Sequence, residues 1–285
     1  SRTLNIGPRD RDLLLQVAHD PKGEFHFAPF PYESGELGRI AMIELPEARK
    51  NETKSEVEFQ FDGRSSLDIS DSELMDWTGK DFTILASIRT EDGGTILAKA
   101  PPEGIWVANA KTFFIREGIL SYDIGWVGAV ESEREIDDGE WHQVGMTYSH
   151  QDGRIRMFID GVLEGEGRLK PREPVEGHVV RIGYASPDFP EVSGFSGAIS
   201  RVKFYQSILP LQQIEAFAED QDQDQGEGIL GDWLTKELKQ GRLRNSVDSR
   251  YTARIVRHAA GERRGRRNTD ARGSSFGNHR ITAAA

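Results

Sequence analysis

Residues 139–163, GEWHQVGMTYSHQDGRIRMFIDGVL, contain the pattern that decides the fold of this chain. Apolar side chains alternate with polar or small ones through residues 143–148 and again through 154–159, which is the period-2 pattern of a half-buried β-strand. Asp152-Gly153 separates the two runs, and an Asp-Gly pair between alternating runs is a strong signal for a hairpin turn. The stretch therefore predicts a β-hairpin with strands of about six or seven residues.

The hairpin begins with Trp141-His142 and ends in Phe-Ile-Asp-Gly at 158–161. This combination resembles the laminin-G-like (LamG) jelly rolls of the concanavalin A-like lectin/glucanase superfamily. Other stretches resemble the strands of that family in the same order, and these are 57–63, 66–69, 81–89, 94–99, 118–125, 181–184 and 195–205. The resemblance covers roughly 56–219 and implies an all-β fold: a two-sheet antiparallel jelly-roll sandwich with short C-terminal helices. We expect Trp141 to fill the core beside the hairpin.

The composition agrees with a folded β domain. Residues 56–209 read as short runs separated by Gly, Pro, Asp and Asn, a spacing typical of an all-β sandwich or barrel. Of the 285 residues, 36% are hydrophobic and none is Cys, so we expect a packed core without disulfides. No run approaches the ~18 consecutive apolar residues of a transmembrane helix, and we therefore expect no membrane span.

We expect three parts along the chain: an N-terminal arm at 1–38, the LamG-like jelly roll at 39–219, and at 220–285 an acidic linker, a short helix and a basic disordered tail. Leu230, Leu234 and Leu238 have the spacing of a helix face. The tail is rich in Arg although the whole chain has a formal charge of −11. Such a tail would contact nucleic acid only non-specifically, by charge.

Glu135, Asp137 and Glu140 match the Glu-x-Asp-x-x-Glu spacing of laminarinase- and licheninase-type glycoside hydrolases, which belong to the same superfamily. A retaining mechanism needs two carboxyl groups about 5–5.5 Å apart on a rigid support. Asp138-Gly139 is a turn signal, so we expect these carboxylates on a loop. We assign no catalytic residue, and the balance favours binding over catalysis.

We assign no metal ligands and no cofactor, with calcium as the alternative. The acidic linker begins like an EF-hand loop, but Gln225 and Gly231 stand where that loop needs Gly and Glu. LamG-like domains often bind calcium through Asp side chains and backbone carbonyls near the sandwich rim. Many bacterial members also carry an Asp-Glu pair in the penultimate strand, where this chain has Ser200-Arg201. The remaining candidate ligands are Asp62, Asp123 and Asp188, and no motif joins them.

Two irregular connections, at 100–112 and 184–195, are the places where we expect a binding rim, because loops at the end of a rigid sandwich commonly carry function. Aromatic faces stack on sugar rings, and Asp or Asn beside them hold hydroxyl groups. The candidate ligand-binding residues are Trp126, Tyr184, Trp106, Tyr122, Asn109, Asp123 and Asp188. For each aromatic residue the alternative is a role as core or loop anchor.

The sequence predicts a non-catalytic recognition module that binds a glycan or a protein surface. The resemblance implies that it is part of a larger extracellular or periplasmic protein. Two alternatives remain: a glycoside hydrolase of the same superfamily, and a purely structural domain beside a catalytic neighbour.

Overall fold

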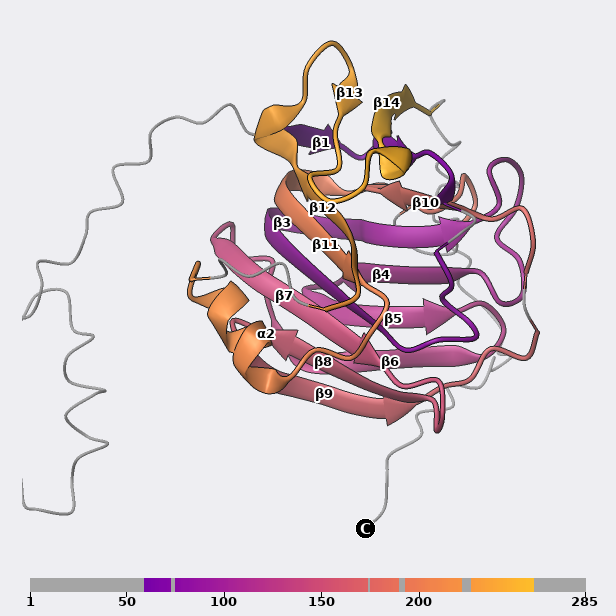
Figure 1. Cartoon of the computed structure of the whole chain (residues 1–285), viewed down its shortest axis with the longest axis vertical. Coiled ribbons are helices and arrows are strands. Elements are labelled where there is room, and N and C mark those ends of the chain that lie inside the picture. The colour runs from indigo at the N-terminus through magenta and orange to yellow at the C-terminus, as the bar shows by residue number, and fades with distance from the viewer. Residues whose placement is uncertain (1–58, 73–74, 174, 190–192, 222–226, 259–285) are drawn as a thin grey trace, which may run out of the picture. The chain divides into compact units, whose positions relative to one another are not determined.

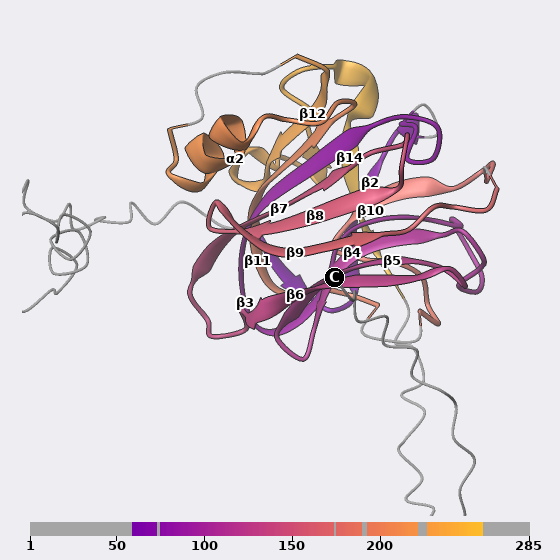
Figure 2. The same cartoon turned by 90° about the horizontal axis from the view of Figure 1, so that it is seen from below.

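A computed structural model describes residues 59–72, 75–173, 175–189, 193–221 and 227–258. Their strands form two antiparallel sheets that pack face to face (Figures 1 and 2). Sheet A contains β1 (Gln60–Asp62), β11 (Ser196–Tyr205), β12 (Ile229–Leu234), β7 (Trp141–Tyr148), β8 (Arg154–Ile159) and β9 (Val162–Arg168). Sheet B contains β13 (Arg242–Leu243), β14 (Ala253–Arg257), β2 (Ser65–Ile69), β10 (Val179–Ile182), β4 (Lys111–Arg116), β5 (Ile119–Ile124) and β6 (Gly128–Glu135). The predicted fold class, an all-β antiparallel jelly roll, is confirmed.

One strand, β3 (Phe82–Ala100), belongs to both sheets. Its first half pairs with β7 and β11 in sheet A, and its second half pairs with β4 and β10 in sheet B. The change occurs near Gly94, which has φ of 110° and lies so close to Gly194 that a Cβ would be 2.1 Å from its carbonyl oxygen. Only glycine fits there. The two strands expected at 81–89 and 94–99 are therefore one bent strand.

The predicted hairpin is confirmed as β7 and β8, with Val144 opposite Ile159 and Tyr148 opposite Ile155. Its apolar positions face the sandwich interior, as the alternation predicts. Phe82 of β3 stacks on Tyr148, with ring centroids 4.9 Å apart. Long-range aromatic packing therefore holds the hairpin against its neighbour in sheet A.

The C-terminal segment, residues 229–257, differs from the prediction of a helix. Residues 229–234 form β12, which pairs with β11, and β14 pairs with β2 in the other sheet. Trp233 is fully buried in the core, where its indole N–H donates to Tyr251 O over 2.7 Å. The helical spacing of the three leucines was misleading, because a strand that can pair with β11 and bury Trp233 gains more than an isolated helix does. Both sheets thus continue beyond residue 219.

Helix α2 (Leu211–Ala218) covers part of the outer face of sheet A (Figure 1). Its buried residues Ile214 and Phe217 pack in one apolar cluster with Leu85 and Phe158. Pro210 occupies the position before the first helical residue, and the helix expected around 210–219 is confirmed. The predicted arm at 1–38, residues 222–226 of the linker and residues 259–285 of the tail lie outside the described residues.

Candidate functional site

Four segments meet at the end of the sandwich where β3 and β5 end, and we call this surface the Trp126 rim. They are residues 101–110, 125–128, 169–172 and 186–189. Backbone N–H groups join them in pairs: Gly125 donates to Ala110 O (2.8 Å), Arg172 to Asn109 Oδ1 (2.8 Å) and Trp106 to Asp188 Oδ1 (2.7 Å). The connections that follow β3 and β5 lie on the right-hand side of Figure 1.

Trp126 is the most unusual residue of the rim. It sits in the turn between β5 and β6, which the hydrogen bond from Val127 N to Ile124 O closes over 2.8 Å. Its side chain is 65% exposed and its φ is 59°. The left-handed region costs a residue with a Cβ about 1–2 kcal/mol, and a large exposed apolar ring adds nothing to the core. The fold therefore gains little from Trp at this position.

Trp106 and Asn109 are buried and hold the rim together. The Trp106 ring meets Phe189 edge to face with centroids 4.6 Å apart, and Phe189 meets Phe114 in the same way at 5.2 Å. Asn109 has φ of 62°, and its carbonyl oxygen accepts a hydrogen bond from the Lys111 ammonium over 2.9 Å. Neither side chain offers a surface to a ligand. The prediction that Trp106 and Asn109 contact a ligand therefore differs from the structure, in which both residues support the rim from within.

Tyr122 and Tyr184 are also withdrawn from the surface. Tyr122 is fully buried between the sheets, where burial raises the pKa of its hydroxyl far above the ordinary value. Tyr184 is 5% exposed and stacks on His258, with centroids 3.7 Å apart and planes within 9°. The sequence placed Tyr184 at the opening of an irregular connection, but His258, the residue after β14, covers its ring. A sugar cannot stack on either ring in this structure.

Asp188 and Asp123 remain accessible. Asp188 is exposed, and only its Oδ1 makes a hydrogen bond within the described residues. Asp123 is half-buried on β5, three residues before Trp126. The structure therefore leaves Trp126, Asp123 and Asp188 of the seven candidates at a surface that a ligand can reach.

Sequence reasoning missed two residues of this rim. Ile105 is 65% exposed in the same connection as Trp106 and adds a second apolar side chain. Arg181 of β10 is 3% exposed, and its guanidinium donates to the carbonyl oxygens of Pro101, Pro102 and Ala185. It thereby ties the connection after β3 to the one after β10. A lone Arg between Val180 and Ile182 was the available signal, since a buried charge needs partners.

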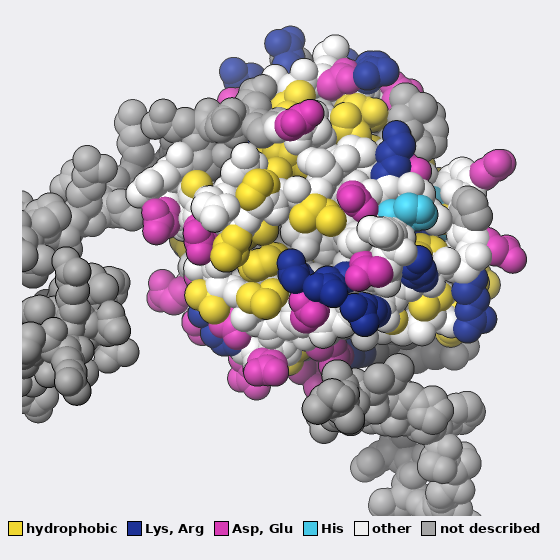
Figure 3. Space-filling view, turned by 60° about the horizontal axis from the view of Figure 1, so that its bottom comes forward, with side chains coloured by type: hydrophobic (Ala, Val, Ile, Leu, Met, Phe, Trp, Pro, Cys, Tyr) yellow, Lys and Arg dark blue, Asp and Glu magenta, His cyan; other side chains and the backbone are white. Residues whose placement is uncertain are grey.

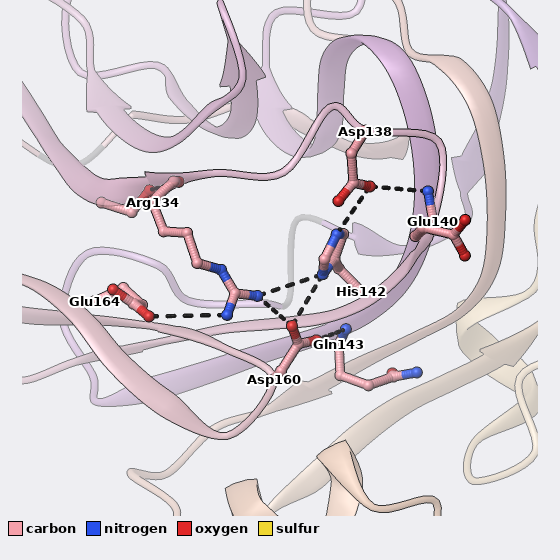
Figure 4. Close-up of polar contacts among 8 residues, drawn as sticks. Arg134, Asp138, Glu140, His142, Gln143, Asp160 and Glu164 are labelled. Atoms are coloured by element: carbon pink, nitrogen blue, oxygen red, sulfur yellow. Dashed lines mark hydrogen bonds and ion pairs between the residues drawn. The ribbon is translucent and has the colours of Figure 1, made fainter. Parts of the chain in front are cut away.

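A second polar network lies at the start of the hairpin (Figure 4). His142 Nδ1 lies 2.9 Å from Asp160 Oδ2, and His142 Nε2 lies 3.2 Å from Asp138 Oδ1. Arg134 also contacts Asp160, which accepts a further hydrogen bond from Gln143 N over 2.9 Å. Burial acts to raise the pKa of Asp160, but the hydrogen bonds from Gln143, His142 and Arg134 hold it below the ordinary value. The network ties the β6–β7 connection to the β8–β9 turn.

The prediction that Trp141 fills the core is wrong. Trp141 is half-buried on the outer face of sheet A, opposite Arg89, whose guanidinium carbon lies 5.1 Å from the centre of its ring. The alternation of β7 explains the difference. Val144, Met146 and Tyr148 point into the sandwich, so the odd-numbered Trp141 points out.

The carboxylates of the hydrolase-like spacing do not share a strand. Glu135 is the last residue of β6, whereas Asp137 and Glu140 lie in the connection to β7. Within that connection, Asp138 accepts a hydrogen bond from Glu140 N over 2.9 Å. The expectation that these groups lie on a loop agrees with this placement, in which only Glu135 belongs to a strand.

Within the described ranges, no three or more His, Asp or Glu side chains are placed to hold a metal ion. Asp62 accepts hydrogen bonds from Arg64 N (3.0 Å) and Ser65 Oγ (2.9 Å) in its own turn. Arg201, at a position where the family resemblance led us to look for an acidic residue, forms a bidentate ion pair with Asp232 at 2.8 and 2.7 Å. It therefore joins β12 to β11.

Two other surfaces are weaker candidates. A shallow hollow of about 240 Å³ lies over β3 and β11, lined by Arg89, Glu91, Asp92 and Gly139 among others, and it is open to solvent. Hydrophobic side chains also group on the face seen in Figure 3, beside a row of Lys and Arg. The exposed apolar residues near α2 are Val162, Leu163, Ile208 and Leu211. Nothing in the described part of the chain shows what would cover them.

The sequence family follows from a match over more than half of the chain. The family model Laminin_G_3, described as "Concanavalin A-like lectin/glucanases superfamily", matches residues 61–215. This chain is a member of that family. The Laminin_G_3 match covers the hairpin and ends shortly before β12, so the C-terminal segment is an addition to the matched unit.

Solved structures agree with the fold of this LamG domain. A putative carbohydrate binding protein from Bacteroides ovatus ATCC 8483 superimposes with a TM-score of 0.50, at 14% identity, over 71% of this chain and 61% of that one. The CBM40 of a Ruminococcus gnavus IT-sialidase superimposes with a TM-score of 0.44, at 14% identity, over 57% and 98%. At 14% identity the first likeness concerns the fold alone, and no argument rests on the second.

One curated relative is a far larger protein. It is the rat "Sushi, von Willebrand factor type A, EGF and pentraxin domain-containing protein 1", 26% identical over 121 residues. The match spans 38% of this chain and 3% of that protein.

Among the described residues, none of the helices has the length and apolar character needed to cross a bilayer.

Proposed function

We propose that this LamG domain is a non-catalytic recognition module that binds a glycan through the Trp126 rim. The observation that carries the proposal is the 65% exposed indole of Trp126, held in a left-handed backbone conformation that its side chain makes costly. The ring stands at the end of a rigid sandwich, and the exposed Ile105 lies in a neighbouring segment. Exposed aromatic side chains on rigid supports suit sugar rings, whose C–H faces stack on them.

The energy available at such a site is modest. If roughly 100 Å² of apolar surface is buried against the indole, burial contributes about 2.5 kcal/mol. Charge-assisted hydrogen bonds from sugar hydroxyls to Asp123 or Asp188 would add to this. Binding of this kind is weak for a single sugar and becomes useful when several modules or repeated ligands act together.

We further propose that the domain works outside the cytoplasm, in the extracellular space or periplasm, as part of a larger protein. A curated relative, in which the match is a small part of a protein with several kinds of domain, supports the proposal that the domain belongs to a larger protein. Residues 259–285 of the basic tail lie outside the described residues, and non-specific contact of the tail with nucleic acid stays a proposal.

A glycan array with the full chain, followed by calorimetry on the best ligand, tests the function. Trp126→Ala should weaken binding by about 1–3 kcal/mol, or ten- to a hundredfold, with little change in thermal midpoint. Trp141→Ala is the matched control, because it removes a half-buried indole outside the rim. Two results would reject the proposal: equal glycan binding by the wild type and Trp126→Ala, or an array on which the wild type binds no glycan.

The two alternatives give different outcomes in the same experiments. A glycoside hydrolase would cleave a β-glucan and lose that activity in Glu135→Gln or Glu140→Gln. A module that binds protein surfaces would bind no glycan on the array. Its binding to an immobilised protein partner would still be weaker in Trp126→Ala than in the wild type. A purely structural domain would show none of these effects.

A further inference from the structure

The C-terminal segment, at the yellow end of the colour scale in Figure 1, forms a second distinctive surface. Backbone hydrogen bonds in both directions join Lys239 and Arg242, at 2.9 and 3.0 Å, and close a tight turn through Gln240 and Gly241. Both turn residues have positive φ, 51° and 74°, as in the two-residue turns that match the twist of a hairpin. The turn therefore gives β13 a fixed direction along β14.

Four exposed cations lie on this surface. Arg242 of β13 stands directly opposite Arg254 of β14, and the Cα atoms of opposite residues in antiparallel strands are about 4.5–5.5 Å apart. The next residue of β13 and the preceding residue of β14 are buried in the core, so the two Arg side chains point to the outer face. Lys239 is the turn partner of Arg242, and Arg244 follows it by two residues. We call Lys239, Arg242, Arg244 and Arg254 the basic strip.

The charge around the basic strip is positive when every charged residue is counted. Residues 235–258 contain seven Lys or Arg and two Asp or Glu, which gives +5 with His258 neutral. The residues 59–72, which include β2 beside β14, contain three Asp and one Arg, which gives −2. The two segments together therefore keep +3, in a chain whose net charge is −11.

Within the described ranges, no side chain of the basic strip forms an ion pair or a hydrogen bond. Like charges on directly opposite residues destabilise a sheet, so the fold gains nothing from Arg at both 242 and 254. Two of the five carboxylates counted above, Glu237 and Asp71, are exposed. The other three lie beside cations outside the strip, and these pairs are Asp248 with Arg250 (2.6 Å), Asp62 with Arg257 (3.8 Å) and Asp68 with Arg181 (3.2 Å).

The chemistry of the basic strip suits a polymer with spaced anionic groups. Guanidinium groups bind carboxylate and sulfate through paired hydrogen bonds. Trp233 and Tyr251 of this segment are buried, so neither ring is open to stack on the bases of a single-stranded nucleic acid. A DNA duplex carries one charge per about 1.7 Å and would press many of them against an otherwise acidic chain. A polysaccharide with one charge on a sugar unit can follow a narrow strip.

We propose that the basic strip is a second binding site, which takes an anionic polysaccharide with carboxylate or sulfate groups along its length. It lies at the opposite edge of sheet B from β5 and β6, whose connection carries Trp126. It also lies beyond residues 61–215, which the family model matches, so it belongs to the C-terminal addition. The Arg side chains hold the anionic groups, and Lys239 adds a point charge.

Matched polymers test the inference in the full chain. Fluorescent dextran sulfate and polygalacturonate are the sulfated and carboxylated probes, and unsulfated dextran is the neutral control. Either anionic polymer should bind at about 50 mM salt while dextran does not. The affinity should fall at least tenfold between about 50 and 200 mM salt, because bound counterions are released and charges are screened.

The double variant Arg242→Gln with Arg254→Gln assigns the binding to the strip. Its affinity should be about tenfold lower at low salt, and the slope of log affinity against log salt should decrease by about two. Its thermal midpoint should stay equal or rise, because the opposed like charges are gone. The matched control, Arg156→Gln with Arg168→Gln on β8 and β9, removes the same charge from sheet A and should bind within about twofold of the wild type.

The Arg-rich tail needs a separate control, because its charges attract the same polymers. In a full-length variant with Ser at its densest Arg cluster, the double substitution in the strip should again weaken binding about tenfold. Binding that is lost in this tail variant and unchanged by the strip substitutions would overturn the inference. The replaced residues are Arg263, Arg264, Arg266 and Arg267.

Other outcomes also decide. Equal binding of dextran and dextran sulfate, or no binding of either anionic polymer, would overturn the strip as a site. Tighter binding of a DNA duplex, or of phosphatidylglycerol–phosphatidylcholine vesicles, would overturn the ligand class. Trp126→Ala should bind the anionic polymers like the wild type, and the strip variant should bind rim ligands normally. Failure of either proposal therefore leaves the other standing.

Discussion

Trp233 and Trp126 are the same residue type in two regions with opposite demands. Trp233 of the C-terminal segment is fully buried, in core contact, and hydrogen-bonded through its indole N–H. Trp126 of the β5–β6 turn is 65% exposed in a strained backbone conformation. The first residue serves the stability of the sandwich, and the second costs stability. The C-terminal segment is therefore part of the fold, whereas the β5–β6 turn can accept a residue that contributes nothing to stability.

The largest effect should follow removal of the C-terminal segment. A chain that ends at residue 228 loses β12 and β14 and uncovers the edges of β11 and β2. We expect it to lose cooperative thermal unfolding, measured by circular dichroism. A chain that ends at residue 258 is the control and should unfold like the full chain. Cooperative unfolding of the shorter chain at an unchanged midpoint would show that the family-matched unit is sufficient alone.

Trp233→Ala should destabilise the domain by about 3–5 kcal/mol, as large-to-small changes in a core do. The change leaves a cavity between the sheets and removes the hydrogen bond to Tyr251 O. The measurement is the free energy of unfolding in urea. Trp126→Ala is the matched control and should change this energy by less than about 1 kcal/mol. Similar losses in the two variants would remove the contrast between the regions.

Acid should weaken the fold through the buried residue His178. Burial first, and then the nearby Lys111 and Lys99, lower the pKa of His178 from 6.5 to about 4. The unfolded chain therefore binds a proton that the folded one does not between these values, so stability is complete above pH 6.5 and falls as the pH drops towards 4. We expect about 1–3 kcal/mol from this group.

His178→Gln cannot titrate and provides the comparison for that loss. Its unfolding free energy should depend less on pH between 6.5 and 4 than that of the wild type. Parallel pH profiles for the two proteins would show that His178 is not the group responsible.

The smallest effect concerns Trp126→Gly. Glycine adopts φ of 59° without strain, but it also gains freedom in the unfolded chain. We expect the free energy of unfolding to stay constant or rise by up to about 1 kcal/mol, while glycan binding is lost. A clear loss of stability, measured by urea unfolding, would mean that the indole packs against the fold.

The rim shows where prediction from sequence stopped. The glycines beside Trp126 suggested an open position, and the ring is exposed. Trp106 and Tyr184 looked similar because they also border irregular connections. Phe189 and His258, which cover them, come from distant parts of the chain. No local pattern distinguishes an aromatic residue that is covered from one that is not.

Resemblance to the LamG family predicted the order of most strands. The sequence by itself determined the β7–β8 hairpin and the start of α2. These features depend on neighbouring residues, on period-2 alternation, an Asp-Gly turn and a proline before the helix. Only the tertiary structure decided that residues 229–234 form a strand, that Trp141 points out and that Trp233 points in. Those outcomes depend on which partner strand is available and on which face of it is buried, and such long-range contacts override local helical spacing.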